Sequence, residues 1–280
     1  MSVDLSANLM QATVEVEQTL ADGSRIMGTG FLVNDPTPDG RGRTVLVTAN
    51  HVFSRMTGAT AHIGYREQDK DGDWRYDPQP LAIRSGKREL WTHNTAHDVA
   101  AIVVKAPAAF AKAAIPISWL ATPDTFTKYD VGPGDEMLVL GYPQGLSADS
   151  AGFPILRSGR VASMIASPAV SSTFLLDFRV FPGNSGGPVF ISQAAHRRPG
   201  EDQAQEVQFV AGMLTQQVEL NNERLEIGIV TDAAFIKDTI ALLDHPGAAH
   251  PLPDDAIVTT ASAPEVSKDA AARIGQAVGD

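Results

Sequence analysis

The chain has 280 residues and contains 22 Lys and Arg against 33 Asp and Glu, which gives a formal net charge of −11. Its length is sufficient for one large domain or two small ones with a substantial core. The negative charge argues against nucleic acid as a partner, because a protein that binds phosphates along a strand needs a basic face. The absence of cysteine excludes disulfides, thiol nucleophiles and thiolate metal sites.

The first residues, MSVDLSANLMQATVEVEQ, have neither the basic start nor the continuous apolar run of an export signal. Nowhere in the sequence do about 18 apolar residues follow one another, so no membrane partner is predicted. We therefore expect a cytoplasmic protein, and the lack of cysteine is consistent with a reducing compartment. The alternative is an exported protein whose signal peptide is absent from this sequence.

Short strands dominate the predicted secondary structure. The alternating stretch Val14–Glu17 and the run Ile26–Val33 flank an Asp22-Gly23 turn signal, which predicts a hairpin. The apolar run Thr44–Ala49 comes next and is short enough for a buried strand. Further strands are predicted at His62–Tyr65, Leu81–Arg84, Val99–Val104, Met137–Leu140, Ile155–Met164, Phe174–Val180, Pro188–Ile191, Val207–Leu214 and Leu225–Val230. Strands this short and frequent indicate barrels or a sandwich.

One helix is predicted near the end of the patterned region. Ile236, Ile240 and Leu243 share a face with Thr239 at helical spacing, and Thr231 or Asp232 is placed to cap the helix, with Gly247 after its end. The stretch Ala106–Asp124, rich in Pro and Ala, is the expected internal boundary. Residues 245–280 contain few large apolar side chains and are predicted to form a mobile tail, or alternatively a docking peptide.

The strongest local signal for chemistry is the stretch Phe181–Val189, FPGNSGGPV. A serine flanked by glycines permits a tight backbone turn and close approach of a substrate, and it leaves backbone N–H groups free to converge on one point. An acyl-transfer nucleophile needs this arrangement, which makes Ser185 a candidate. The alternative is a glycine-rich turn that exposes a serine.

A serine hydroxyl is a weak nucleophile until a base takes its proton and a third group orients that base. His51 follows the predicted buried strand Thr44–Ala49, and Asp98 precedes the apolar run Val99–Val104. A lone histidine or aspartate at a strand end is typically structural. In the order His, Asp, Ser, the three residues together predict a catalytic site.

These motifs resemble those of the chymotrypsin-like serine peptidases, and among them the bacterial trypsin-like and HtrA-type peptidase domains, here without a PDZ domain. The matching stretches follow one another in order within residues 9–244, and they are Gly28–Val33 (GTGFLV), Val47–Val52 (VTANHV), His97–Ala100 (HDVA) and Pro182–Val189 (PGNSGGPV). The resemblance implies an all-β fold of two six-stranded antiparallel β-barrels with a C-terminal helix. Residues 9–120 would form the barrel with the histidine and aspartate, 121–244 the barrel with the serine and the helix, and 245–280 the tail.

The same resemblance implies a role for each site residue. His51 would be the general base, Asp98 the carboxylate that orients it, and Ser185 the nucleophile. The backbone amides of Gly183 and Ser185 would form the oxyanion hole. No metal and no cofactor are expected.

The resemblance also implies residues that contact substrate. Arg179, six residues before the nucleophile, would lie at the base of the pocket for the P1 side chain, where an unpaired guanidinium favours an acidic residue. Alternatively, Arg179 points outward or pairs with a carboxylate such as Asp177. The residues Met213, Leu214 and Thr215 resemble the strand that pairs with the substrate backbone.

Asn184 stands where the digestive members of the family carry an aspartate that pairs with a newly cut N-terminus. A neutral amide cannot form that ion pair, so activation by N-terminal cleavage is not expected. The sequence therefore predicts a serine endopeptidase that acts on proteins or peptides, with a protein activator as a hypothesis.

Two other functions compete with this prediction. An α/β-hydrolase also carries a G-x-S-x-G motif, but its acid and histidine follow the serine in the chain. A binding or scaffold protein with the protease fold would stay inactive until a partner ordered its oxyanion loop.

Overall fold

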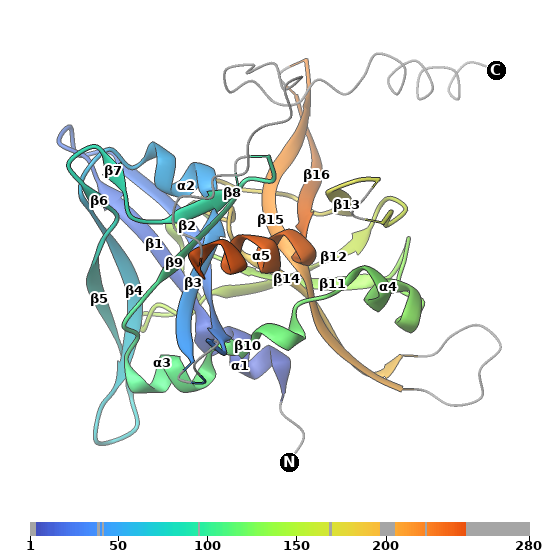
Figure 1. Ribbon diagram of the computed structural model, residues 1–280, viewed down its shortest axis with the longest axis horizontal. Coiled ribbons are helices and arrows are strands. Elements are labelled where there is room, and N and C mark those ends of the chain that lie inside the picture. Colours follow the sequence, from blue (N-terminus) through green and yellow to red (C-terminus); the bar gives the residue numbers. More distant parts are fainter. Residues whose placement is uncertain are drawn as a thin grey trace.

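The computed structural model describes residues 4–37, 40, 42–94, 96–167, 170–196, 205–221 and 223–244. The tail predicted at 245–280, with Gly247, lies outside these ranges. Two main β-sheets, antiparallel except for one short strand, lie side by side, and the last helix crosses the face that they share (Figure 1). Strands are the main elements, as the sequence predicted.

The first sheet contains eight strands. Its main path runs in the order β5-β4-β1-β2-β3-β9-β8, and the short strand β10 pairs with β2 in parallel. The bounds are β1 (Thr13–Thr19), β2 (Arg25–Asp35), β3 (Arg43–Ala49), β4 (Thr60–Gln68), β5 (Trp74–Ala82), β8 (Thr92–Asn94), β9 (Val99–Val103) and β10 (Ile115–Pro116), while β6 (Arg84–Ser85) and β7 (Arg88–Glu89) pair separately. The hairpin predicted around Asp22-Gly23 is confirmed, because β1 and β2 pair from Thr13 and Phe31 onward.

This sheet differs from the six-stranded barrel that was predicted for the first half. Within the described ranges, the strand path ends at β5 on one side and at β8 on the other, and no pairing joins these two edge strands. Pro78 and Pro80 in β5 have no N–H to donate to a further strand, and β8 is only three residues long. Neither β5 nor β8 therefore offers a long row of backbone hydrogen bonds through which this sheet could close into a barrel.

The second sheet is a closed six-stranded antiparallel barrel, as predicted for the second half. Its strands follow one another around the barrel in the order β11-β12-β13-β16-β15-β14. The bounds are β11 (Glu136–Gly141), β12 (Ile155–Val161), β13 (Thr173–Asp177), β14 (Pro188–His196), β15 (Gln205–Leu220) and β16 (Glu223–Asp232). Beyond the closed part, β15 and β16 extend together as a hairpin (Figure 1).

The predicted C-terminal helix is confirmed as α5 (Ala233–Ala241), and Asp232 caps it by accepting from the amide of Ala234 at 2.7 Å. The other helices were not predicted, because elements of three to eight residues are too short to display a helical period. They are α1 (Leu5–Ala12), α2 (Asn50–Arg55), α3 (Ala108–Ala113), α4 (Pro123–Tyr129) and the 3-10 turns η1 (Ile117–Trp119), η2 (Pro143–Gly145) and η3 (Leu242–Asp244).

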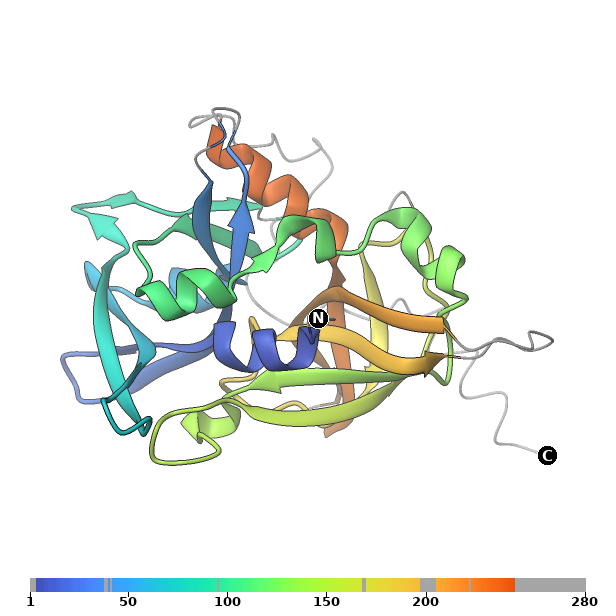
Figure 2. The same cartoon turned by 90° about the horizontal axis from the view of Figure 1, so that it is seen from below.

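Two segments tie the sheets together. Seen from below, α1 lies where the two sheets meet (Figure 2), and its Leu5 amide donates to Gln208 of β15 at 2.9 Å. The expected boundary, Ala106–Asp124, lies in the connection between β9 and β11, where the Ala121 amide donates to the Val210 carbonyl at 2.8 Å. A single cluster of buried apolar side chains runs through both sheets. The division at residues 120 and 121 stays a prediction.

Arg66 is a buried cation that joins the two halves. Its side chain on β4 is 2% exposed, and its guanidinium donates to the Tyr142 hydroxyl at 3.0 Å and to the Gly152 carbonyl at 2.9 Å. It also donates to the carbonyls of Gln11 and Thr13 at 2.6 and 3.0 Å. Several acceptors replace the water that the guanidinium loses on burial. Arg66 thus links β4 to the segment after β11.

Glu15 is a buried carboxyl on β1, and its environment gives a first testable expectation. Burial, with a smaller contribution from Glu17, raises its pKa above the ordinary 4.5. The folded state therefore binds this proton more tightly than the unfolded state, and stability is lost as the pH rises above 4.5. We expect the free energy of unfolding of Glu15→Gln to fall less steeply with pH than that of the wild type, as measured by urea unfolding from pH 4.5 to 7. An unchanged slope would contradict the assignment.

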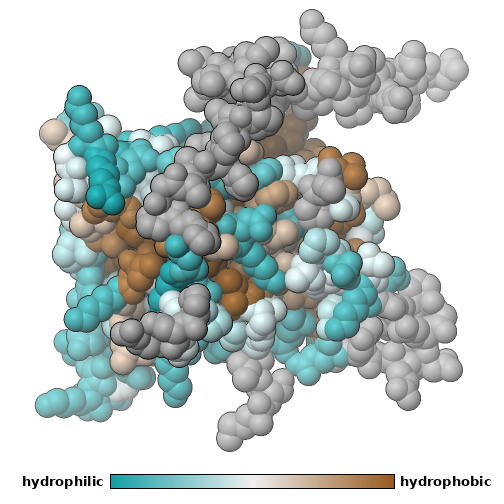
Figure 3. Space-filling view, in the orientation of Figure 1, coloured by the Kyte–Doolittle hydropathy of each residue, from teal (hydrophilic) through white to brown (hydrophobic). Residues whose placement is uncertain are grey.

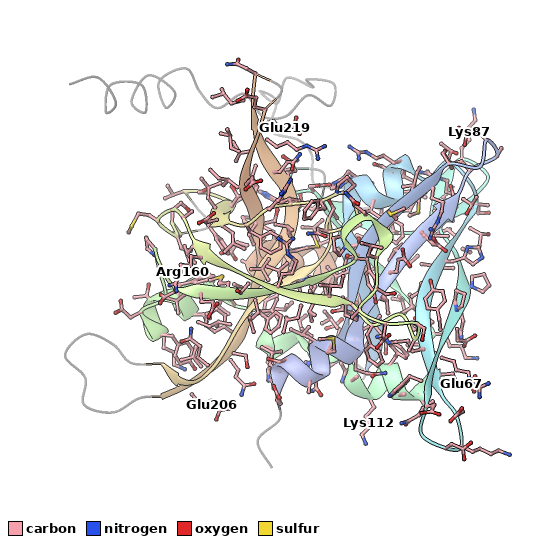
Figure 4. All side chains as sticks on the ribbon, turned by 180° about the vertical axis from the view of Figure 1, so that it is seen from behind. Glu67, Lys87, Lys112, Arg160, Glu206 and Glu219 are labelled. Carbon is pink, nitrogen blue, oxygen red and sulfur yellow. The ribbon has the colours of Figure 1, made fainter. Side chains whose placement is uncertain are left out.

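The surface is largely polar on the face seen in Figure 1, with apolar atoms showing in patches near its centre and left (Figure 3). From behind, the labelled charged residues lie at the rim and point outward, as Glu67, Lys112 and Glu219 illustrate (Figure 4). Among the described residues, no helix is long and apolar enough to cross a membrane.

Candidate active site

His51 and Asp98 are brought together by the pairing of two strands. Ala49, the last residue of β3, pairs with Val99, the first residue of β9, so the residues that flank this pair meet at one end of the sheet. The Asp98 carboxylate accepts from the His51 backbone amide at 2.9 Å and lies 2.7 Å from the ring nitrogen Nδ1. Asp98 thereby orients both the backbone and the ring of His51.

The orientation of Asp98 depends on its backbone. Its φ of +54° is a left-handed conformation, one that aspartate tolerates better than most residues. The Asp98 carbonyl accepts from the Asn50 amide at 3.0 Å and keeps this turn against the start of α2. A carboxylate at Nδ1 requires the proton on that nitrogen in the neutral ring, which leaves Nε2 with the lone pair. His51 is therefore set up to accept a proton at Nε2.

A hydrogen bond to its backbone carbonyl holds Ser185 beside the end of β3. The Thr29 amide of β2 donates to the Ser185 carbonyl at 2.8 Å, and the Thr48 hydroxyl of β3 donates to the Thr29 carbonyl at 2.7 Å. Thr48 precedes His51 by three residues. The Ser185 hydroxyl donates to the Thr215 carbonyl at 3.2 Å, and within the described ranges no hydrogen bond joins it to His51.

The backbone around Ser185 leaves the amides on either side of Asn184 without acceptors. Every carbonyl from residue 181 to 185 is taken, through the pairs Asn184 N to Phe181 O (3.0 Å), Gln144 N to Pro182 O (2.6 Å), Thr29 Oγ1 to Gly183 O (2.7 Å), Gly187 N to Asn184 O (3.0 Å) and Thr29 N to Ser185 O (2.8 Å). The amides of Gly183 and Ser185, by contrast, have no partner among the described residues. Gly183 is buried and Ser185 half-buried, and an N–H left open in such a place calls for a functional explanation.

Gly183 must be a glycine for this arrangement to form. Its φ is +93°, and a Cβ added to it would lie 2.2 Å from the Tyr142 carbonyl oxygen. Gly186 has a φ of +91°, and a Cβ there would lie 1.9 Å from the Thr29 carbonyl oxygen. The glycines on both sides of Ser185 therefore permit the close backbone contacts that the sequence motif predicted.

The three residues predicted to pair with substrate differ in their surroundings. Met213 and Leu214 are fully buried, and Leu214 uses its backbone to pair with Gly186 and Gly187 inside the barrel. Beyond Leu214, the one described strand that pairs with β15 is β16, because the described pairing of β14 with β15 extends only as far as Met213. Thr215 therefore stands where an open strand edge begins, directly beside Ser185.

Arg179 is directed outward. Its side chain is 62% exposed, its Nε lies 3.2 Å from a carboxylate oxygen of Glu226, and its guanidinium lies over the Phe181 ring. The hypothesis of an acidic P1 preference required an unpaired guanidinium. The outward alternative describes the observed side chain, with Glu226 as the partner in place of Asp177.

Three residues that contact the Ser185 loop were missed in the sequence. Thr29, Tyr142 and Gln144 hold the backbone of residues 182–185, as the hydrogen bonds above and the close contact at Gly183 show. Thr29 belongs to the motif Gly28–Val33. That motif indicated a resemblance to a known family, but nothing in it predicted that Thr29 contacts the Ser185 loop. In the part of the chain that the structure describes, no cluster of His, Asp and Glu side chains could hold a metal ion.

Comparison with protein families matches residues 28–195 to the trypsin-like peptidase domain family. The match spans 60% of the chain and includes His51, Asp98 and Ser185. No curated protein matches the chain.

Solved structures share the fold at low sequence identity. The HtrA-type protease AlgW with a tripeptide is 14% identical at a TM-score of 0.52, and the match covers 86% of this chain and 63% of that one. The Rv3671c protease from M. tuberculosis, in its active form, is 18% identical at a TM-score of 0.50, with coverage of 89% and 86%. The chain thus spans less than two thirds of the AlgW chain. These similarities show a chymotrypsin-like fold.

Proposed function

The chain belongs to the trypsin-like peptidase family, and from this membership we propose that it is a serine endopeptidase that cleaves proteins or peptides through an acyl-enzyme. In this proposal Ser185 is the nucleophile, His51 the general base and Asp98 the carboxylate that orients the base. The backbone amides of Gly183 and Ser185 form the oxyanion hole.

The observation that carries the proposal is the pair of open amides beside a serine. A trans peptide directs its N–H opposite to its carbonyl. The carbonyls of Pro182 and Asn184 are both engaged by the protein, so the N–H groups of Gly183 and Ser185 face away from those contacts. Two such donors near one hydroxyl stabilise the negative oxygen that forms when the hydroxyl attacks a carbonyl.

The chemical steps follow from the orientation of His51. Rotation about the Ser185 Cα–Cβ bond redirects the hydroxyl from the Thr215 carbonyl toward His51 Nε2, which takes its proton. Ser185 Oγ then attacks the substrate carbonyl carbon, and the two amides hold the resulting oxyanion. His51 returns the proton to the departing amine. Water, deprotonated in turn by His51, releases the acyl group and regenerates Ser185.

The substrate backbone is proposed to add to the open edge of β15. That edge begins at Thr215, whose carbonyl is in contact with the Ser185 hydroxyl, and continues through Gln216 and Gln217. An extended peptide placed there would gain main-chain hydrogen bonds with little dependence on its sequence. Arg179 is not proposed to select an acidic P1 side chain, because its guanidinium lies at the surface and already pairs with Glu226.

Activation without N-terminal cleavage is part of the proposal. Asn184 is 2% exposed, and its side-chain oxygen has no hydrogen-bond partner among the described residues. A neutral amide here offers no charge for a new N-terminal amine to pair with. A protein activator stays a second hypothesis, and it would act on the oxyanion loop through the first sheet, whose Thr29 holds that loop.

The proposal is tested by labelling with a fluorophosphonate, which modifies an activated serine. The wild type should react at Ser185 at neutral pH, and both Ser185→Ala and His51→Ala should lose labelling, since one removes the nucleophile and the other its base. Intact mass spectrometry measures the adduct, and profiling of a proteome-derived peptide library against Ser185→Ala identifies the cleaved bonds.

Ser192→Ala serves as the matched control, since this serine lies on β14 of the same barrel. It should label like the wild type. A wild-type protein that neither labels nor cleaves any library peptide would contradict the endopeptidase proposal and favour the binding or scaffold alternative.

A further inference from the structure

Four consecutive peptide groups around Ser185 are each held through their carbonyl oxygens. They run from the peptide after Pro182 to the peptide after Ser185, and their donors are Gln144 N, Thr29 Oγ1, Gly187 N and Thr29 N. One residue of the first sheet, Thr29, thus holds two of the four. Gly187 belongs to the same loop, so Thr29 and Gln144 are the two residues outside the loop that donate hydrogen bonds to it.

The Thr29 hydroxyl also reaches the Gln144 support. It donates to the Gly183 carbonyl at 2.7 Å and accepts from the Tyr142 amide at 3.1 Å. Tyr142 begins the tight turn that contains Gln144, whose φ of +56° is left-handed. One buried hydroxyl therefore connects the oxyanion loop to the turn that holds the Pro182 carbonyl.

Thr29 is itself rigidly placed. It is fully buried in β2, and its carbonyl accepts from the Thr48 hydroxyl at 2.7 Å. Thr48 lies near the end of β3, and His51 is the second residue of α2, which begins directly after this strand. The sheet that places the general base therefore also places the Thr29 clamp, by which we mean Thr29 with its contacts to Gly183, Ser185 and Tyr142.

We propose that Thr29 is a positioning residue of the reaction, which sets the direction of the oxyanion-hole amides by holding the Gly183 and Ser185 carbonyls and the Tyr142 turn. This inference rests on the proposed function and names a residue that the triad and the hole do not include. Without the hydroxyl, the Gly183 carbonyl and the Tyr142 amide would be buried and unpaired, and the loop would relax to satisfy them. Relaxation would move the amides relative to Ser185 Oγ.

Thr29→Val tests the clamp, because valine keeps the shape of threonine and removes the hydroxyl. With a cleaved library peptide as substrate, kcat should fall about 10-fold or more, since small misplacements of catalytic groups are costly. KM should stay within about twofold, because binding along β15 does not use this hydroxyl. Thr29→Ser restores a hydroxyl and should recover most of the activity.

Thr239→Val is the matched control. Thr239 is also fully buried, and its hydroxyl also donates to a carbonyl at 2.7 Å, but within α5. This variant should keep the wild-type kcat. A second measurement, amide hydrogen exchange of residues 181–187 by mass spectrometry, should show faster exchange in Thr29→Val and no change in Thr239→Val.

The outcomes separate the clamp from the proposed function. A Thr29→Val protein with kcat within about twofold of wild type and unchanged exchange would overturn the clamp while leaving the endopeptidase intact. A wild type that neither cleaves nor labels would overturn the endopeptidase. In that case the hydrogen-exchange measurement by itself tests the Thr29 clamp. Faster exchange of residues 181–187 in Thr29→Val supports the clamp, and unchanged exchange refutes it.

Discussion

Asp98→Asn should reduce kcat/KM by about 10⁴-fold while leaving the fold intact. The Asp98 carboxylate lies 2.7 Å from His51 Nδ1 and accepts from the His51 amide at 2.9 Å. An asparagine that keeps the contact with the backbone amide would place its NH2 group against Nδ1. The neutral ring must then carry its proton on Nε2, where it cannot accept the proton of Ser185. Steady-state hydrolysis of a cleaved library peptide measures this loss.

Asp35→Asn is the matched control for this change. Asp35 is also a largely buried aspartate of the first sheet, but its carboxylate pairs with Arg43 at 2.7 Å. Its replacement should alter stability and leave kcat/KM near the wild-type value. Circular dichroism verifies that both variants are folded. An Asp98→Asn enzyme within about tenfold of the wild type would show that this carboxylate does not set the His51 tautomer.

Gly183→Ala should lower both the stability of the protein and its activity. Alanine at a φ of +93° is strained, and its Cβ would overlap the Tyr142 carbonyl oxygen at 2.2 Å. The two effects together should cost about 3 kcal/mol or more of unfolding free energy. The Gly183 amide should also be displaced, and loss of an oxyanion-hole donor typically lowers kcat about 10²- to 10³-fold.

Two other glycines separate the causes of this loss. Gly134 has a φ of +92° with no atom within 4 Å of an added Cβ, so Gly134→Ala carries the backbone strain alone, about 1–2 kcal/mol. Gly132 has open space and no positive φ, so Gly132→Ala should be close to neutral. Urea unfolding and peptide hydrolysis are measured for all three variants. Equal stability losses in Gly183→Ala and Gly134→Ala would show that the loop yields to the added methyl group.

The strands and the final helix were predictable because their signals are local. Val14–Glu17 alternates with a period of two, Asp22-Gly23 marks a turn, and Asp232 stands directly before the apolar face of α5. The short helices gave no comparable signal, since α2 and α3 contain only six residues each. The closure of each sheet has no local signal, because it depends on which edges meet. The resemblance implied two closed barrels, and of the two main sheets only the second closes in the described part of the chain.

In the candidate site, too, some features could be predicted from the sequence and others could not. The sequence by itself determined the chemical groups and their order, His51, Asp98 and Ser185, together with the glycines that permit the turn around the serine. Only the tertiary structure decided which partners those groups meet. Glu226 of β16 pairs with Arg179, and Thr29 holds Gly183 across 154 residues of chain. A hydrogen bond between residues so far apart leaves no period or spacing in the sequence, because it exists only once two separate sheets have packed together.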